Sequence, residues 1–267
     1  MSDGSGQRLD AALAARGLAR SRTHAARLIT EGLVTVDGEP VVKASRTVHP
    51  EQTIVIAGAD HYVSRAAHKL VAALDAFAIP VAGRTALDVG ASTGGFTQVL
   101  CERGVARVVA LDVGHGQLAA EVAADPRVTV VEGFNARELS PPSLAEAVGE
   151  PMAPDLVVGD LSFISLTMII PALVRTAAEG ADLVLLVKPQ FEVGRTGIRE
   201  GIVRDPGLRA DAVATVLWSA WDAGLGTAGI VSSPILGGAG NHEYLVHLST
   251  VGSNPTEWLE RVTELSR

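Results

Sequence analysis

One stretch in the first half of the chain limits the folds that this sequence can adopt. It reads Thr85-Ala-Leu-Asp-Val-Gly-Ala-Ser-Thr-Gly-Gly-Phe-Thr97, an apolar, partly β-branched run with one carboxylate, followed by small residues. Its three glycines have no Cβ, so the backbone can turn tightly there and approach a ligand closely. A helical pattern then follows from Phe96 to Arg103. A strand, a glycine turn and a helix N-terminus together predict an α/β sheet that presents free N–H groups to a small ligand.

The glycine spacing narrows the choice of ligand. The loop lacks both the Gly-Lys-Ser/Thr ending of a P-loop and the G-x-G-x-x-G spacing of dinucleotide-binding loops. Its D-x-G-x-x-x-G-G form is typical of loops that bind S-adenosylmethionine (SAM), although an ordinary tight strand–helix turn is the alternative. Asp112 ends the next strand, where a carboxylate can accept hydrogen bonds from ribose hydroxyls, and Asn135 follows the third strand, where it can meet the adenine. The candidate cofactor-binding residues are Asp88, Gly90, Ser92, Thr93, Gly94, Gly95, Phe96, Asp112, Asn135 and Asp160.

Apolar runs alternate with helical patterns beyond the loop, as in a parallel doubly wound sheet. The helix before the sheet is expected to begin with Ser64 as its cap. We therefore predict an α/β fold: a Rossmann-like SAM-dependent methyltransferase sheet over residues 64–267, a linker at 59–63, and a small N-terminal α+β domain over residues 1–58. Further strands are expected at 107–111, 128–132, 155–159, 182–187, 227–231 and 243–250.

The N-terminal segment differs from the remainder in charge. Residues 1–58 carry 7 Lys/Arg against 6 Asp/Glu, whereas residues 59–267 carry 15 against 24, and the whole chain has a net charge of −8. This net charge argues against a protein that is held on nucleic acid by bulk charge alone. Two helical patterns that end at Gly17 and Gly32 precede an Asp37-Gly38 turn, which indicates a hairpin. Arginines cluster near the start of the second helix.

Four charged side chains are expected to converge beyond the carboxyl ends of the strands. Asp160 follows the fourth strand, Lys188 follows the fifth, Glu243 starts the last, and Lys69 lies in the helix before the sheet. A ribose hydroxyl is a poor nucleophile at neutral pH and needs a base when it attacks a methyl sulfonium. A lysine serves as that base when burial and a second cation favour its neutral form. Lys188 is the candidate base and Lys69 its electrostatic partner, while the two carboxylates would orient them; singly, each residue would be an ordinary salt-bridge member.

Several motifs resemble known families. Residues 6–58 resemble the S4 RNA-binding domain, in Arg8-Leu9-Asp10, Gly17, Ser21-Arg22, Ala25-Ala26, Ile29, Gly32, Val34, Val36 and Asp37-Gly38. The order Lys69, Asp160, Lys188, Glu243 resembles the tetrad of ribose 2′-O-methyltransferases. Nearly the whole chain resembles the TlyA (hemolysin A) family, in Ser64-Arg-x-x-His-Lys-Leu70, Asp88-x-Gly-Ala-Ser-Thr-Gly-Gly-Phe-Thr97, Asp112-Val-Gly-x-Gly-Gln-Leu118, Asp160-Leu-Ser-Phe-Ile-Ser-Leu166, Val187-Lys-Pro-Gln-Phe-Glu-Val-Gly194 and Gly240-Asn-x-Glu-Tyr244.

The resemblance implies an enzyme that uses SAM to methylate the ribose 2′-oxygen of cytidine in ribosomal RNA (rRNA), in the 16S RNA, the 23S RNA or both. It also implies that the S4 domain docks rRNA or ribosomal subunits while the Rossmann-like domain binds SAM. In S4 domains, arginines of the second helix face phosphates, which orient RNA without reading its sequence. The candidate RNA-binding residues are Arg8, Arg20, Arg22, Arg27 and Arg65.

Four other functions compete with this one. A base methyltransferase usually needs an Asn/Asp-Pro-Pro-Tyr/Phe element, whose prolines are absent from Asp160-Leu-Ser-Phe163. Pseudouridine synthases also combine an S4 domain with an Arg-Leu-Asp motif, but here Arg8-Leu9-Asp10 falls in the S4 helix. A cytolysin, which the family's historical name suggests, would need a signal peptide, a membrane span or a basic amphipathic helix. A non-enzymatic ribosome-binding protein would need the SAM loop to be vestigial.

Cysteine content and hydropathy indicate the cellular setting. The single cysteine, Cys101, excludes a disulfide framework and a Cys-rich metal site, so no metal is expected. The N-terminal residues do not resemble a signal peptide. The longest apolar region, 161–174, is shorter than the roughly 20 residues of a membrane span. We expect a soluble, cytoplasmic protein, and the sequence specifies no oligomeric state.

Overall fold

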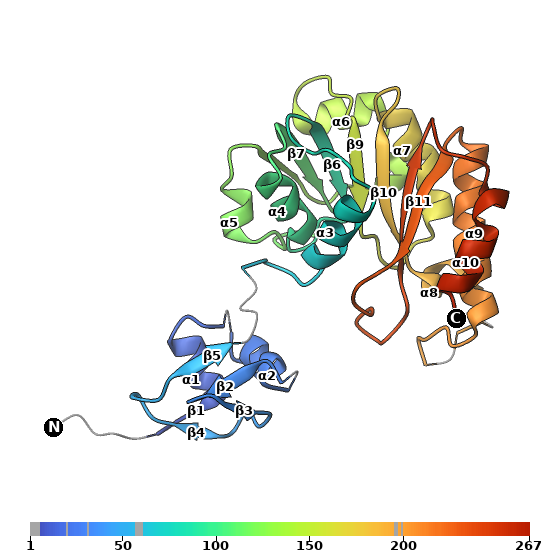
Figure 1. Ribbon diagram of the computed structural model, residues 1–267. Helices are drawn as coiled ribbons and strands as arrows, with labels where there is room; N and C mark the ends of the chain where they lie inside the picture. The colour runs from blue at the N-terminus through green and yellow to red at the C-terminus, as the bar shows by residue number, and fades with distance from the viewer. Residues whose placement is uncertain (1–5, 20, 31, 57–60, 195–196, 199) are drawn as a thin grey trace. The chain divides into compact units, whose positions relative to one another are not determined.

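The computed structural model describes residues 6–19, 21–30, 32–56, 61–194, 197–198 and 200–267. The chain forms two compact units, Met1–His61 and Tyr62–Arg267 (Figure 1). The boundary between the expected domains, 1–58 and 64–267, lies close to this division in the sequence. Residues 59 and 60 of the expected linker lie outside the described residues, so its limits remain a prediction.

The smaller unit packs two short helices against a small antiparallel sheet. Leu9, Leu13, Ile29, Val34 and Val36 are fully buried between them and form its core. Strand β2 lies between β3 and β5, and the two-residue strand β1 pairs with β4, a pairing that the sequence did not predict. The elements are β1 (Gln7–Arg8), α1 (Leu9–Ala15), α2 (Arg22–Thr30), β2 (Val34–Val36), β3 (Glu39–Val41), β4 (Thr47–Val48) and β5 (Ile54–Ile56).

The larger unit is built on a seven-stranded sheet in the order β11-β12-β10-β9-β6-β7-β8. Strands β10, β9, β6, β7 and β8 are parallel, whereas β12 is antiparallel to both of its neighbours. The last strand along the chain, β12, therefore lies inside the sheet, between β10 and β11. The strands are β6 (Thr85–Val89), β7 (Arg107–Leu111), β8 (Val128–Val131), β9 (Leu156–Gly159), β10 (Asp182–Val187), β11 (Gly226–Ser232) and β12 (Tyr244–Ser249).

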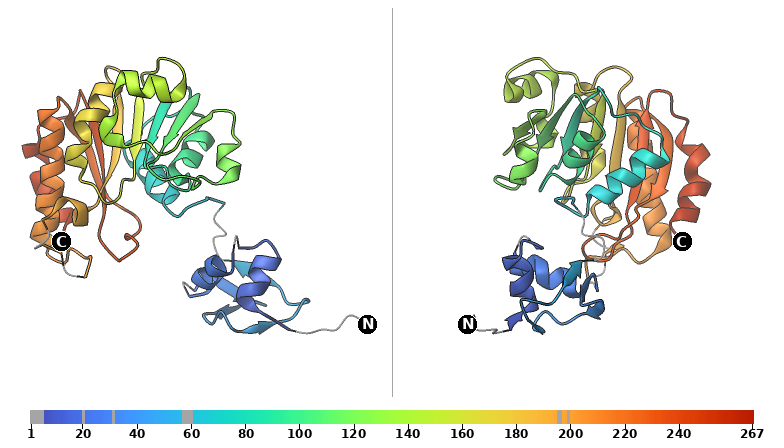
Figure 2. Two further views of the ribbon diagram at one scale, coloured as in Figure 1. Left: turned by 180° about the vertical axis from the view of Figure 1, so that it is seen from behind. Right: turned by 60° about the vertical axis from the view of Figure 1, so that its left-hand side comes forward.

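Helices cover both faces of this sheet, which Figure 2 shows from two further directions. One hydrophobic cluster joins the sheet to α3 (Ala67–Ala76) and α4 (Gly95–Glu102). A second cluster joins the opposite face to helices that come later in the chain. Because both faces are covered, the central parallel strands are almost entirely apolar. The helices of the second face are α6 (Pro141–Val148), α7 (Ile170–Thr176), α9 (Pro206–Asp222) and α10 (Leu259–Leu265).

The expected N-cap of the helix before the sheet was wrong by two residues. Helix α3 begins at Ala67, and Ala66 occupies its N-cap without a side-chain hydrogen bond. Ser64 Oγ instead accepts a hydrogen bond from Ala66 N at 3.2 Å, which fixes a turn ahead of the helix. This turn packs against the start of α4, where a Cβ on Gly95 would lie 2.9 Å from the Cβ of Ser64.

The topology places one crevice at the centre of the sheet. Strands β6 and β9 are neighbours, yet the chain runs outward from β6 through β7 and β8 before it returns to β9. In open α/β sheets, ligands bind outside the carboxyl ends of the strands at such a switch point. Gly90 follows β6 and Asp160 follows β9, so both expected site segments lie there. Among the described residues, helices that could cross a membrane are absent.

Candidate active site

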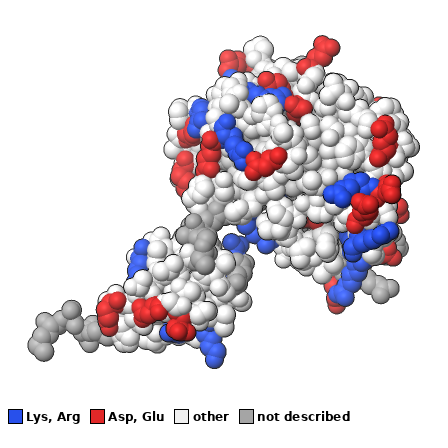
Figure 3. All heavy atoms as spheres, viewed as in Figure 1, with Lys and Arg blue, Asp and Glu red and all other residues white. Residues whose placement is uncertain are grey.

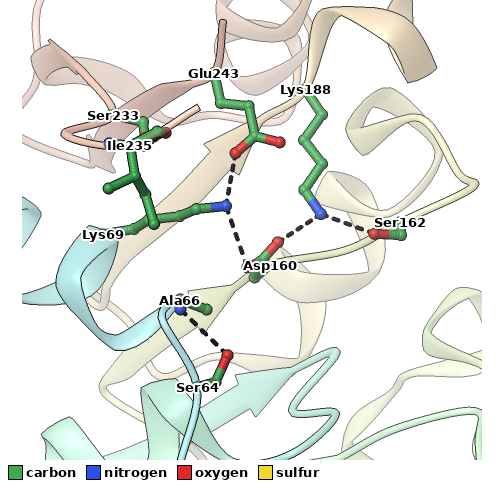
Figure 4. Close-up of polar contacts among 9 residues, drawn as sticks. All are labelled: Ser64, Ala66, Lys69, Asp160, Ser162, Lys188, Ser233, Ile235 and Glu243. Atoms are coloured by element: carbon green, nitrogen blue, oxygen red, sulfur yellow. Dashed lines mark hydrogen bonds and ion pairs between the residues drawn. The ribbon is translucent and has the colours of Figure 1, made fainter. Parts of the chain in front are cut away.

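Four charged side chains from distant parts of the chain meet in the larger unit (Figure 4). Lys69 Nζ lies 2.6 Å from Glu243 Oε2 and 3.9 Å from Asp160 Oδ2. Lys188 Nζ lies 2.6 Å from Asp160 Oδ1, on the other oxygen of the same carboxylate. The structure therefore brings together all four residues of the expected tetrad, with Asp160 between the two lysines.

The tetrad is largely removed from solvent. The side chains of Lys69 and Glu243 are 7% and 3% exposed, and those of Lys188 and Asp160 are 10% and 15% exposed. Charges that are buried in this way need partners, because each loses its hydration. Two ammonium groups and two carboxylates satisfy that requirement together.

Rigid elements hold each of the four side chains. Lys69 lies in the first turn of α3, and Glu243 directly precedes β12. Lys188 lies between β10 and the short helix α8 (Pro189–Glu192), whose first residue is a proline. Proline at this helix position has its φ angle fixed by the ring, so the backbone after Lys188 is preorganised.

The contacts of Ser162 and Glu192 beside the tetrad were not predicted from the sequence. Ser162 Oγ accepts a hydrogen bond from Lys188 Nζ at 2.7 Å. Glu192 accepts hydrogen bonds from Ser165 Oγ at 2.5 Å and from Leu166 N at 2.9 Å, and burial raises the pKa of its carboxyl. These contacts join the loop after β9 to Lys188 and to helix α8, which follow β10. Ser162 and Ser165 lie in an irregular loop and α8 has only four residues, so no periodic pattern could have indicated these contacts.

The glycine loop follows β6 as expected. Gly90 adopts a φ of +82°, and a Cβ there would lie 3.1 Å from the carbonyl oxygen of Asp160. Glycine is therefore required for the loop to lie against the segment that carries the tetrad carboxylate.

Asp88 lies inside the protein and does not reach the surface of the crevice. Its side chain is fully buried, and its Oδ2 accepts a hydrogen bond from Thr97 Oγ1 at 2.6 Å, which ties β6 to α4. Its Oδ1 has no hydrogen-bond partner among the described residues. Burial raises the pKa of Asp88 to about 7, and the charges of Asp160 and Asp112 act in the same direction. Asp88 is thus placed to support the loop from behind.

Asp112 and Asn135 take the positions that the strand pattern predicted. Asp112 follows β7 and accepts hydrogen bonds from Ser92 N and Gly114 N, both at 2.8 Å. A carboxylate has about four lone-pair sites, so these two bonds leave capacity for a ligand. Asn135 follows β8, and its Oδ1 accepts a hydrogen bond from Arg137 N at 3.1 Å.

A cavity of about 550 Å³ lies along these segments, and a second of about 160 Å³ adjoins it. Of the expected cofactor residues, the larger cavity is lined by Gly90, Ser92, Asp112, Asn135 and Asp160. Besides residues that it shares with the larger cavity, the smaller one is lined by Thr93, Gly95, Phe96 and Lys188. Asp88 and Gly94 line neither of these two cavities. Asp160 and Ser162 line both, so the tetrad adjoins the two spaces.

The larger cavity also has apolar walls that the sequence did not predict. Leu111, Phe134 and Ile169 line it. Phe163, at the mouth, is 92% exposed and has a φ of +64°, and its ring centroid lies 5.3 Å from that of Phe191. A positive φ at a phenylalanine is an uncommon backbone conformation and a signal of function that only a structure reveals.

In the smaller unit, one carboxylate holds two of the expected RNA-binding arginines. Asp10 accepts two hydrogen bonds from the guanidinium of Arg8, both at 3.0 Å, and one from Arg22 at 3.3 Å. The arginine side chains are 51% and 62% exposed, whereas that of Asp10 is 8% exposed. The hydrogen bonds from Arg8 lower the pKa of Asp10 to about 2. Figure 3 shows both signs of charge on the viewed face of this unit, in line with its nearly balanced charge.

For the other three expected RNA-binding arginines, the structure gives exposure or nothing at all. Arg27 lies in the last turn of α2 and is exposed, and Arg65, in the larger unit, is also exposed. Arg20 lies outside the described residues. Their roles therefore remain predictions.

Models of two known protein families match this chain, one in each unit. The FtsJ-like methyltransferase family model matches residues 62–250, and the S4 domain model matches residues 7–54. The first match covers most of the larger unit, and the second covers most of the smaller one.

Individual relatives cover almost the whole chain. The "16S/23S rRNA (cytidine-2'-O)-methyltransferase TlyA" of Mycobacterium tuberculosis is 53% identical over 91% of this chain and 90% of its own length. "Hemolysin A" of Brachyspira hyodysenteriae is 37% identical over 90% of this chain and 98% of its own length. A solved structure of a hemolysin-named protein from Streptococcus thermophilus has a TM-score of 0.76 and 36% identity, and the match covers 99% of this chain and 96% of that one.

Proposed function

The chain belongs to the TlyA family of FtsJ-like methyltransferases that carry an S4 domain, and from that premise we propose that it methylates ribosomal RNA at the ribose 2′-oxygen of cytidine, with SAM as the methyl donor. The observation that carries the proposal is the convergence of Lys69, Asp160, Lys188 and Glu243 beside the cavities at the switch point of the sheet.

The larger cavity fits SAM in size and in chemistry. Its volume of about 550 Å³ falls within the range of roughly 300–1,000 Å³ for small-molecule sites. Asp112 would accept hydrogen bonds from the ribose hydroxyls, and the apolar wall of Leu111, Phe134 and Ile169 would contact the adenine. Asn135 would offer its amide nitrogen as a donor and the second lone pair of its oxygen as an acceptor.

The tetrad would supply the proton transfer that this reaction needs. SAM, when bound, supplies an electrophilic methyl carbon whose sulfur takes the electron pair of the broken carbon–sulfur bond. The 2′-oxygen of the RNA forms the new bond to that carbon, and its proton passes to Nζ of Lys188. Asp160 positions Lys188, while Glu243 and Asp160 hold Lys69 and limit the net positive charge of the site.

The smaller unit would bring the RNA to this site. Arg8 and Arg22 expose half or more of their side chains while Asp10 holds them in place. Guanidinium groups held in this manner suit phosphate oxygens, which they contact without reading the base sequence. An rRNA substrate also implies that the protein acts in the cytoplasm, where ribosomes assemble.

The test is to map methylation in rRNA from cells that contain or lack the protein. We expect one or more cytidines to lose 2′-O-methylation without it, and purified protein with SAM to restore the mark on ribosomal subunits or on free rRNA. Calorimetry with SAM gives a separate measure of binding. Binding of SAM and rRNA with no methyl transfer would instead indicate a non-catalytic ribosome-binding protein.

A further inference from the structure

Ser162 contacts the candidate base but belongs to no part of the tetrad. Its hydroxyl accepts a hydrogen bond from Lys188 Nζ at 2.7 Å, and it lines both cavities. We propose that Ser162 is a positioning residue that aims the lone pair of Lys188 at the incoming ribose hydroxyl. The proposal rests on the methyl transfer proposed above.

The argument starts from the geometry of a lysine amine. As a base, Nζ carries two N–H groups and one lone pair, arranged tetrahedrally about the bond to Cε, and rotation about that bond exchanges their directions. Ser162 Oγ accepts a hydrogen bond from one N–H group at 2.7 Å, whereas the contact of Nζ with Asp160 Oδ1 at 2.6 Å is an ion pair without hydrogen-bond geometry. The hydrogen bond to Ser162 therefore restrains the directions that the lone pair can take. With Asp160 alone, the ion pair would hold Nζ in place but would leave its N–H groups and its lone pair free to rotate.

The remaining surroundings of Lys188 do not replace this acceptor. The ring centroid of Phe191 lies 6.0 Å from Nζ and offers a cation a π-face, which is not a hydrogen-bond acceptor of comparable strength. Lys69 and Glu243, the other charged groups of the site, lie beyond Asp160 in the network. Ser162 is therefore the second oxygen that the described structure provides to Nζ.

Removal of the hydroxyl should have two effects of opposite sign. A hydrogen bond from an ammonium group is roughly twice as strong as one from a neutral amine, so its loss disfavours the ammonium form more. Ser162→Ala should therefore make Lys188 easier to deprotonate and move the acid limb of the kcat–pH profile to lower pH. The maximal kcat should nevertheless fall, by about tenfold, because the lone pair is no longer aimed.

The experiment compares full-length wild type, Ser162→Ala and Ser162→Thr, with Thr215→Ala as a control that removes an exposed hydroxyl from α9. Three quantities are measured: kcat against pH on ribosomal subunits, SAM affinity by calorimetry, and the rate at which acetic anhydride acetylates Lys188 in protein without SAM or RNA, followed by mass spectrometry. The last readout does not depend on turnover.

For Ser162→Ala we expect a lower maximal kcat, an acid limb at lower pH, faster acetylation of Lys188 and unchanged SAM affinity. Ser162→Thr, which keeps the hydroxyl, should restore all of these. An unchanged kcat, slower acetylation, or a loss of SAM affinity that accounts for the loss of rate would each overturn the positioning role. A wild type that forms no 2′-O-methylcytidine would overturn the proposed function itself, and this inference with it.

Discussion

In the smaller unit, the ion pair of Arg8 with Asp10 leaves the arginine half exposed, whereas in the larger unit the pair of Lys69 with Glu243 leaves both side chains covered. The first arrangement keeps a cation available to an outside partner while its position is fixed. The second makes each charge depend on the others, because water no longer solvates it. These two kinds of ion pair thus suit the two roles proposed above, RNA docking in the smaller unit and proton transfer in the larger one.

The pKa values of two aspartates, one in each unit, are shifted in opposite directions. The guanidinium of Arg8 holds the pKa of Asp10 at about 2, whereas burial raises that of Asp88 to about 7. The four predictions below test this contrast, beginning with the largest expected effect.

Replacing Lys188 with alanine should abolish methyl transfer. General bases contribute about 10²–10⁴-fold to rates, so kcat should fall by at least that range while SAM affinity stays nearly unchanged. Lys188→Arg is the matched control, because it keeps the charge beside Asp160 but cannot give up its proton. If the arginine variant retained normal turnover, charge alone would suffice and Lys188 would not be the base.

Replacing Glu243 with glutamine should destabilise the larger unit strongly. Removing one partner of a buried ion pair typically costs about 3–5 kcal/mol of unfolding free energy, because the other charge stays buried. Glu264→Gln is the control, since its pair with Arg261 is about half exposed and should contribute less than about 1 kcal/mol. Denaturant unfolding of both variants measures the difference. Equal losses would show that burial does not separate these two classes of pair.

Replacing Asp88 with asparagine should change how stability depends on pH. The folded protein holds the proton of Asp88 up to about pH 7, while the unfolded chain releases it near the ordinary pKa of 3.8. Wild type should therefore lose stability relative to Asp88→Asn as pH rises from about 4 to about 7, by as much as roughly 4 kcal/mol. Unfolding free energies across this pH range provide the measurement. Parallel curves for the two proteins would contradict a raised pKa.

Replacing Arg22 with alanine should have the smallest effect on stability, below about 1 kcal/mol, because Arg22 is 62% exposed and Asp10 keeps its two hydrogen bonds from Arg8. Affinity for rRNA should fall, and the slope of log affinity against log salt concentration should decrease in magnitude by about one, as expected for the loss of one phosphate contact. Arg261→Ala, in the larger unit, is the control and should leave both quantities unchanged. An unaltered salt slope for the Arg22 variant would argue against a phosphate contact.

The sequence predicted the parallel sheet well because its central strands are continuous apolar runs. The limits of β7 and β10 agree with the prediction to the residue. The same apolar runs gave no indication that Asp88 is buried. Helices cover both faces of its strand, so the sequence has no polar face against which the burial of a carboxylate could be judged. Strand β1 was missed because two residues are too few to show a period.

The tetrad was predicted because its members follow strand ends or precede the sheet, and topology brings such positions together. The contacts of Ser162 and Glu192 were not predicted, because they depend on the path of the irregular loop after β9. The same holds for the start of α3. Ser64 suits a helix cap by type, but its hydroxyl bonds within a turn that packs on α4.

The insertion of β12 between β10 and β11 has a consequence for synthesis. A nascent polypeptide that has emerged only through β11 contains Lys69, Asp160 and Lys188, but it lacks Glu243 and leaves a gap between two strands. When β12, the last strand to be translated, enters the sheet, it closes that gap and brings Glu243 into the tetrad at the same time. We therefore expect activity to begin only when translation of the chain is nearly finished, so that a ribosome cannot be modified by the copy it is still making.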